Sequence, residues 1–113
     1  MTLREEQTAF SKDIHKLQGY LLDNSYEWTD GECYRTQKQQ EWYVEQGLSK
    51  TLKSMHLKRL ARDINIFKDG SYLLSKDTLQ HIGDYWESLD PKNRWGGNWI
   101  SFQDCPHFER YVP

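Results

Sequence analysis

The hydrophobic and polar positions along the chain follow the period of helices in some segments and of strands in others. Apolar side chains recur at spacings of four, three and four within residues 4–23, which predicts an amphipathic helix. Capping residues and a closing glycine predict a second helix over 36–47, with Trp42 and Tyr43 on its buried side. A third helix is expected over 75–89, where four apolar residues form a stripe.

Residues 61–67 alternate with a period of two, so Asp63 and Asn65 share one face of a predicted strand and Ile64 and Ile66 share the other. Further strands are expected at 26–29, 71–74, 99–102 and 107–111, with an Asp-Gly hairpin turn before the second of these and the loop 94–99 leading into the third. The order of elements predicts an α+β fold with three helices packed on a small antiparallel sheet. No linker or repeat divides residues 1–113, so we expect a single domain.

Composition narrows the possible functions. A mean hydropathy of −0.96 and 28% charged residues favour a soluble protein with no stable membrane association, and we expect a monomer. The net charge of −2 gives no electrostatic case for nucleic-acid binding. Two cysteines, Cys33 and Cys105, do not make a disulfide framework and are expected to be free thiols. A role for Cys105 as a metal ligand is disfavoured, because no second cysteine pair accompanies it.

Two histidines and an aspartate provide the candidate chemistry. His56 and Asp63 lie seven residues apart, and His107 follows far downstream. Two imidazoles and one carboxylate are a ligand set that binds Zn²⁺ and leaves a fourth position open for water. Asp104, three residues before His107, is close enough in sequence to act on that water. These residues predict a small zinc hydrolase.

The stretch around these ligands resembles the S-x-H-x-x-G-x-A-x-D signature of the zinc D-Ala-D-Ala carboxypeptidase family, which includes vancomycin-resistance dipeptidases and phage L-alanyl-D-glutamate endolysins. Ser54, His56, Ala61 and Asp63 match it, whereas Arg59 occupies the glycine position. The second half of the signature, an acidic residue three before a histidine, is also present. The likeness covers about residues 31–109 and implies the fold shared by these peptidases and the Hedgehog signalling domain.

The resemblance also implies roles for individual residues. Asp104 would be the general base, and an aspartate there is typical of the endolysins. Arg35, within a Tyr-Arg-Thr sequence that the endolysins share, would steady the substrate or the developing oxyanion. Ser54 would bind substrate or orient a neighbour. Independently of the resemblance, the strand period places Glu109 on the same face as His107, where it would act as an outer partner of the metal ligands.

The sequence therefore predicts a zinc peptidase that cuts the L-Ala–D-Glu bond of peptidoglycan, as a phage or prophage endolysin. Residues 1–6 lack a hydrophobic signal core, so we expect synthesis in the host cytoplasm and access to the wall through a holin. A D-alanyl-D-alanine carboxypeptidase is the alternative within this class. A zinc-bound, non-catalytic binding module is the alternative outside it, and the presence of Asp104 favours the enzyme.

Overall fold

The computed structural model describes residues 1–113 and confirms the predicted α+β class. The helices are α1 (Leu3–Asp23), α2 (Gln37–Glu45) and α3 (Lys76–Ser88), with short 3₁₀ turns η1 (Met55–Lys58) and η2 (Gly96–Asn98). The strands are β1 (Glu27–Asp30), β2 (Ala61–Lys68), β3 (Ser71–Tyr72), β4 (Asn93–Trp95) and β5 (His107–Arg110). Every strand pair is antiparallel, in the order β1-β2-β5-β4, and β3 also pairs with β2.

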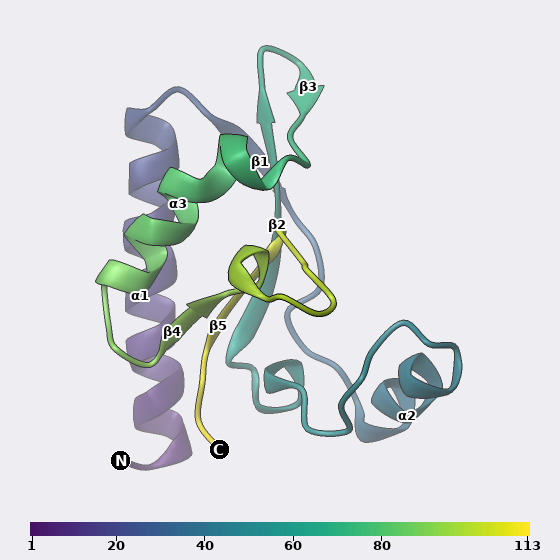
Figure 1. The fold of residues 1–113 in the computed structure, drawn as a ribbon. Coiled ribbons are helices and arrows are strands. Elements are labelled where there is room, and N and C mark those ends of the chain that lie inside the picture. The colour runs from purple at the N-terminus through teal and green to yellow at the C-terminus, as the bar shows by residue number, and fades with distance from the viewer.

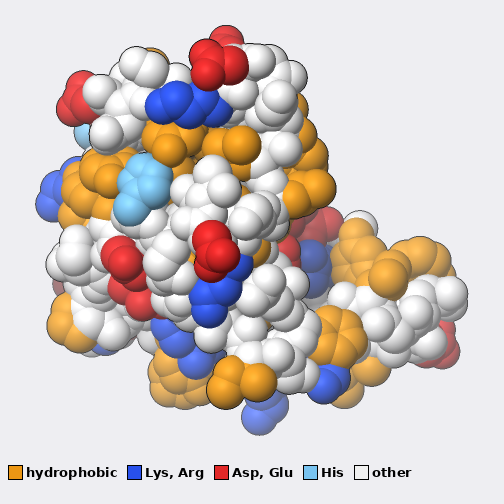
Figure 2. Space-filling view, turned by 45° about the horizontal axis from the view of Figure 1, so that its top comes forward, with side chains coloured by type: hydrophobic (Ala, Val, Ile, Leu, Met, Phe, Trp, Pro, Cys, Tyr) orange, Lys and Arg blue, Asp and Glu red, His pale blue; other side chains and the backbone are white.

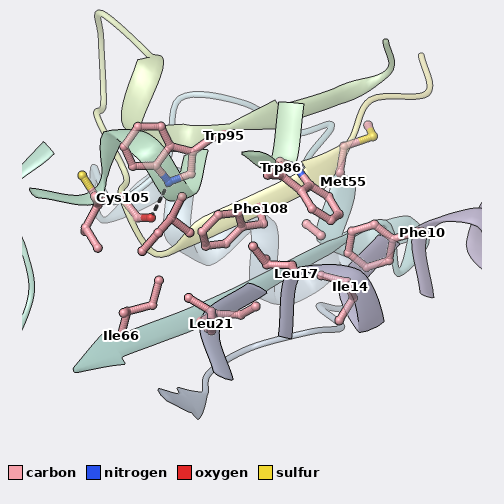
Figure 3. Close-up of a cluster of buried hydrophobic side chains, with 14 of the residues drawn as sticks. Phe10, Ile14, Leu17, Leu21, Met55, Ile66, Trp86, Trp95, Cys105 and Phe108 are labelled. Atoms are coloured by element: carbon pink, nitrogen blue, oxygen red, sulfur yellow. Dashed lines mark hydrogen bonds between the residues drawn. The ribbon is translucent and has the colours of Figure 1, made fainter. Parts of the chain in front are cut away.

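The long helix α1 and the shorter α3 lie together on one side of the sheet (Figure 1). Thr2 and Glu5 form a capping box that starts α1. The apolar stripe of α1 faces β2 and the aromatic side chains Trp86 and Phe108, and together they form most of a core of 15 residues (Figure 3). None of the helices is long and apolar enough to cross a membrane.

Strand β2 is the centre of the sheet because it pairs along both of its edges. One end pairs with β1, up to Asp30 opposite Ile64, and the other end pairs with β5, where Asp63 lies directly opposite His107. Ile64 and Ile66 are buried in the core, while Asp63 points to the other face, as the period-two pattern predicts. The sheet therefore brings together two side chains that are 44 residues apart in sequence (107 minus 63).

A buried charge cluster ties the start of α1 to the last strand. The Arg110 guanidinium donates two hydrogen bonds to Glu6 at 3.0 and 2.8 Å, and the Lys92 ammonium lies 2.9 Å from the other Glu6 oxygen. Arg110 also pairs with Asp90 at 2.9 Å. Hydrogen bonds from Lys92 and Arg110 hold the pKa of Glu6 below its ordinary value. The cluster therefore holds the C-terminal end of β5 against the first turns of α1.

The strand predicted at 99–102 is wrong. Residues 93–95 form the strand instead, pairing with β5, and 99–102 run as bends with Ile100 fully exposed. The reason is Trp95, which is completely buried and donates its indole N–H to the Cys105 carbonyl at 2.7 Å (Figure 3). Its ring also packs against Gly83 of α3. A side chain at Gly83 would overlap the indole ring, so this packing requires glycine.

The predicted burial of Trp42 and Tyr43 in α2 is also wrong. Trp42 is 51% exposed, Tyr43 is half-buried, and the buried residue of this helix is Gln40, whose amide binds the following loop at Ser49 and Thr51. Helix α2 stands away from α1, α3 and the sheet (Figure 1). Because no other helix or strand packs extensively against α2, its aromatic residues have no core to enter. Figure 2 shows the lobe that contains α2 separated from the rest of the molecule by a recess with acidic and basic side chains.

Candidate metal centre

Three side chains from three separate elements converge on one side of the sheet. His56 comes from η1, Asp63 from β2 and His107 from β5, and their ligand atoms all lie within 4.8 Å of one another. The Asp63 Oδ1 atom is 3.4 Å from His56 Nε2 and 3.5 Å from His107 Nδ1. The two imidazoles are buried, at 1% and 5% exposure. The sequence predicted these three residues as ligands, and the fold brings all three together.

The backbone around η1 fixes His56. The Ser54 hydroxyl accepts a hydrogen bond from the His56 N–H at 3.2 Å and caps the 3₁₀ turn. Arg59 ends the turn in the left-handed conformation, with φ of 55°, and the chain then enters β2. This conformation favours glycine, which agrees with the glycine that the resembling signature has at the position of Arg59.

Each imidazole is oriented by an acceptor on its far side. The His56 Nδ1 atom lies 3.1 Å from the Cys33 carbonyl oxygen, and His107 Nε2 lies 2.7 Å from Glu109 Oε1. A neutral imidazole that donates at one nitrogen presents a lone pair at the other. In these tautomers, both histidines direct lone pairs toward the Asp63 carboxylate, whose Oδ1 is buried without a hydrogen-bond partner. Three electron-pair donors that face one another in this way are an arrangement that a cation satisfies.

The charges in this group are strongly coupled. Burial by itself would raise the pKa of Asp63, but the adjacent imidazoles hold it far below its usual range. Burial likewise opposes a charged His107, yet the neighbouring carboxylates of Asp63 and Glu109 raise the pKa of this imidazole to about 9, so a metal ion that binds here would displace a proton from it. Glu109 remains ionised beside His107 and Arg94, which lower its pKa despite burial. The carboxylates thus make this pocket attractive to positive charge.

Two of the three separations between the ligand atoms fit a tetrahedral metal ion. Zinc bonds to imidazole and carboxylate are about 2.1 Å long, so the edges of such a tetrahedron measure roughly 3.4 Å. The distances of 3.4 and 3.5 Å from Asp63 to the two histidines match that edge. Together with the unpartnered Asp63 oxygen, these two distances show that the donor set fits a metal ion, while the third separation, between the two imidazole nitrogens, is within 4.8 Å.

Asp104 lies beside the three ligands, but its side chain is more exposed to solvent than theirs. Its Oδ2 is 4.0 Å from His107 Nδ1, and its side chain is 48% exposed in the cleft. Partial burial, with a contribution from the Asp63 carboxylate, raises the pKa of Asp104 despite the opposing His107. Its backbone is held against Gly96, where a side chain would collide with the Asp104 carbonyl.

Arg35 and Ser54 line the same cleft of about 680 Å³. The Arg35 guanidinium is already engaged, because it pairs with Glu32 and donates to Gln40 at 2.7 Å. Its backbone N–H donates to the His56 carbonyl at 3.2 Å, which ties the segment before α2 to the metal-ligand turn. The Ser54 hydroxyl faces the His56 backbone, as described above.

Three specific contacts within the site were not predicted from the sequence. The Cys33 carbonyl carries no side-chain signal, so no motif could reveal it. Arg94 holds Glu109 through two hydrogen bonds at 3.0 and 2.8 Å, and the antiparallel register of β4 and β5 creates this pair. Trp99 lies against His107, with ring centroids 4.9 Å apart. Knowing that 93–95 pairs with 108–110 would have predicted the Arg94 contact.

The fold and this group of residues define a class: a small α+β protein with a buried His–Asp–His set and an acidic side chain in an open cleft, the arrangement of hydrolases that use a metal ion. A sequence profile of the D-alanyl-D-alanine carboxypeptidase family matches residues 47–110, more than half of the chain, and the chain belongs to this peptidase family. Among proteins with curated functions, no sequence match is found.

A solved structure similar to this chain is the L-Ala D-Glu endopeptidase ChiX of Serratia marcescens. The TM-score is 0.68 at 25% sequence identity, over 96% of this chain and 85% of that one. The likeness extends beyond the profile match and includes α1 and α2. The overall fold is therefore that of a known endopeptidase.

Proposed function

We propose that this protein is a zinc-dependent peptidoglycan peptidase that cleaves the bond between L-Ala and D-Glu of the stem peptide. The observation that carries the proposal is the convergence of His56, Asp63 and His107 beside Asp104, at an open cleft that the two histidines and Asp104 line. Membership of the peptidase family supports the reaction class, and the likeness to ChiX favours this bond. Because the chain resembles endolysins, we also propose that the protein acts in lysis of a host cell by a phage or prophage.

In this proposal His56, Asp63 and His107 hold zinc, which when bound polarises the scissile carbonyl and acidifies water. Asp104 takes the proton of the attacking water and delivers it to the leaving amine. Its raised pKa suits that second step, because a more basic carboxylate retains the proton until the amine departs. Arg35 stays close to Glu32 and steadies the substrate or the developing oxyanion from the cleft wall.

The test is digestion of purified peptidoglycan followed by mass analysis of the fragments and labelling of new amino termini. We expect new D-Glu amino termini, with L-Ala left on the muramic acid. Activity should disappear with a chelator and return with stoichiometric Zn²⁺. His56→Ala, Asp63→Ala and His107→Ala should each lose bound zinc and activity together. Full activity in a protein free of metal would contradict the proposal.

A D-alanyl-D-alanine carboxypeptidase is the second candidate, favoured by the description of the matching family. That reaction releases free D-Ala from pentapeptide stems and creates no D-Glu amino terminus. The same digestion therefore separates the two candidates. Release of D-Ala without new D-Glu termini would assign the protein to the carboxypeptidase branch.

A further inference from the structure

The cations that line the cleft divide into two kinds. Arg35 pairs with Glu32, and Arg94 pairs with Glu109 at 2.8 Å, so each guanidinium is neutralised by a carboxylate of the protein. The remaining two cations are lysines, Lys50 and Lys53, both on the loop between α2 and η1. Neither ammonium pairs with a carboxylate. The lysine and arginine side chains of the cleft that have no carboxylate partner therefore lie on this loop.

Lys50 reaches across the cleft, whereas Lys53 does not. The Lys50 ammonium donates to the Ser101 hydroxyl and lies 4.8 Å from the centre of the Phe102 ring. Both partners are neutral, and an ammonium has three N–H donors, so Lys50 keeps capacity for an anion. Ser101 lies three residues before Asp104, on the wall that carries the proposed base. Lys50 thus brings an uncompensated charge to the wall where the chemistry would occur.

Of the carboxylates around the ligands, Glu109 is paired with Arg94 and Asp63 would bind the metal ion, so Asp104 is the one that faces the cleft without an arginine or lysine partner. The stem peptide adds another carboxylate. Its D-Glu continues the chain through the side-chain carboxyl group, so the α-carboxylate is free and sits on the carbon that carries the leaving nitrogen. A carboxylate brought beside that of Asp104 is repelled unless a cation meets it.

We propose that Lys50 binds the free α-carboxylate of D-Glu and makes the enzyme select stems with D-Glu over stems in which this group is amidated. The proposal rests on the proposed L-Ala–D-Glu cleavage. Lys50 is then a specificity-determining residue, because amidation removes the negative charge and leaves the rest of the substrate unchanged. The ammonium exchanges the neutral Ser101 contact for a charged one, which is the stronger hydrogen bond.

The test compares kcat/KM for two soluble muropeptides that differ only at this group, one with D-Glu and one with D-isoglutamine. We expect the wild type to prefer the free carboxylate by about tenfold, the size of one charge-assisted hydrogen bond in a partly open cleft. Lys50→Met should reduce this preference to near unity, and Lys50→Arg should retain most of it. The side chain is exposed, so neither substitution threatens the fold.

Lys53→Met is the matched control, because it removes the same charge from the same loop without breaking a contact across the cleft. We expect it to keep the preference for D-Glu. Equal rates on both muropeptides by the wild type, or a preference that survives Lys50→Met or is lost in Lys53→Met, would overturn the assignment to Lys50. Failure of the wild type to cut either muropeptide after L-Ala would instead refute the proposed function.

Discussion

Replacement of Glu109 by glutamine tests whether this buried carboxylate sets the strength of metal binding. Glu109 is 3% exposed and accepts from His107 Nε2 at 2.7 Å on one oxygen and from Arg94 on the other. Glutamine preserves the shape and one acceptor oxygen but removes the charge. The substitution therefore alters how strongly His107 is polarised and leaves the three ligands in place.

The expected loss follows from the change in that one hydrogen bond. A bond to a charged group contributes roughly 1.5–3 kcal/mol and a neutral one about 0.5–1.5 kcal/mol. The difference of about 1–2 kcal/mol corresponds to zinc binding that is roughly 5- to 30-fold weaker. Outer partners of metal-bound histidines typically contribute about 10- to 100-fold in affinity, which agrees with this value.

The assay is competition for Zn²⁺ against a chromophoric chelator at neutral pH, with thermal unfolding of both proteins measured in parallel. Glu6→Gln is the matched control, because Glu6 is also a buried carboxylate held by an arginine but lies in the α1 cluster. It should lower stability and leave zinc affinity unchanged. An unchanged affinity in Glu109→Gln, or an equal loss in Glu6→Gln, would refute the reasoning.

Three further predictions concern catalysis and stability. Asp104→Asn should retain about one zinc per chain by metal analysis and lose turnover by about 10²-fold or more; a near wild-type rate would exclude Asp104 as the base. Gly83→Ala should destabilise the fold by roughly 1–3 kcal/mol in urea unfolding, because its methyl group overlaps a fully buried indole; an unchanged midpoint would show that the helix can shift at no cost. Lys92 and Arg110 lower the pKa of folded Glu6 below its unfolded value of about 4.3, so its stabilisation is present above that pH and is lost as the pH falls through the folded pKa. Glu6→Gln should therefore unfold more easily than wild type at pH 7, by a margin that shrinks toward pH 3; a constant margin would contradict this.

The local sequence was sufficient to predict the structure and the site where one pattern determined both. The alternation around Asp63 predicted the strand and the direction of the carboxylate, because a strand that buries Ile64 must present its neighbour to the opposite face. The ligand spacing then predicted which side chains would meet. Caps such as Thr36 located the helices for the same reason, since the signal and the structure are adjacent in sequence.

The sequence was insufficient where tertiary contacts decided the outcome. Residues 99–102 carry strand-forming side chains, but Trp95 occupies the core and Ile100 stays exposed to solvent. Helix α2 has two adjacent aromatic residues, yet no other helix or strand lies beside it, so Trp42 stays exposed. Periodicity indicates that a face is apolar and does not indicate what covers that face.

The segment from residue 36 to residue 53, which holds α2 and the loop that follows it, has one more consequence. None of the 15 core residues comes from it, although it contributes Ser49, Lys50 and Lys53 to the cleft. Substitutions and length changes in most of this lobe would alter ligand selection with little effect on folding. We therefore expect related enzymes to differ in this lobe according to the type of cell wall that they cut, while the metal ligands stay constant. The same separation makes the lobe a suitable unit for exchange between related enzymes.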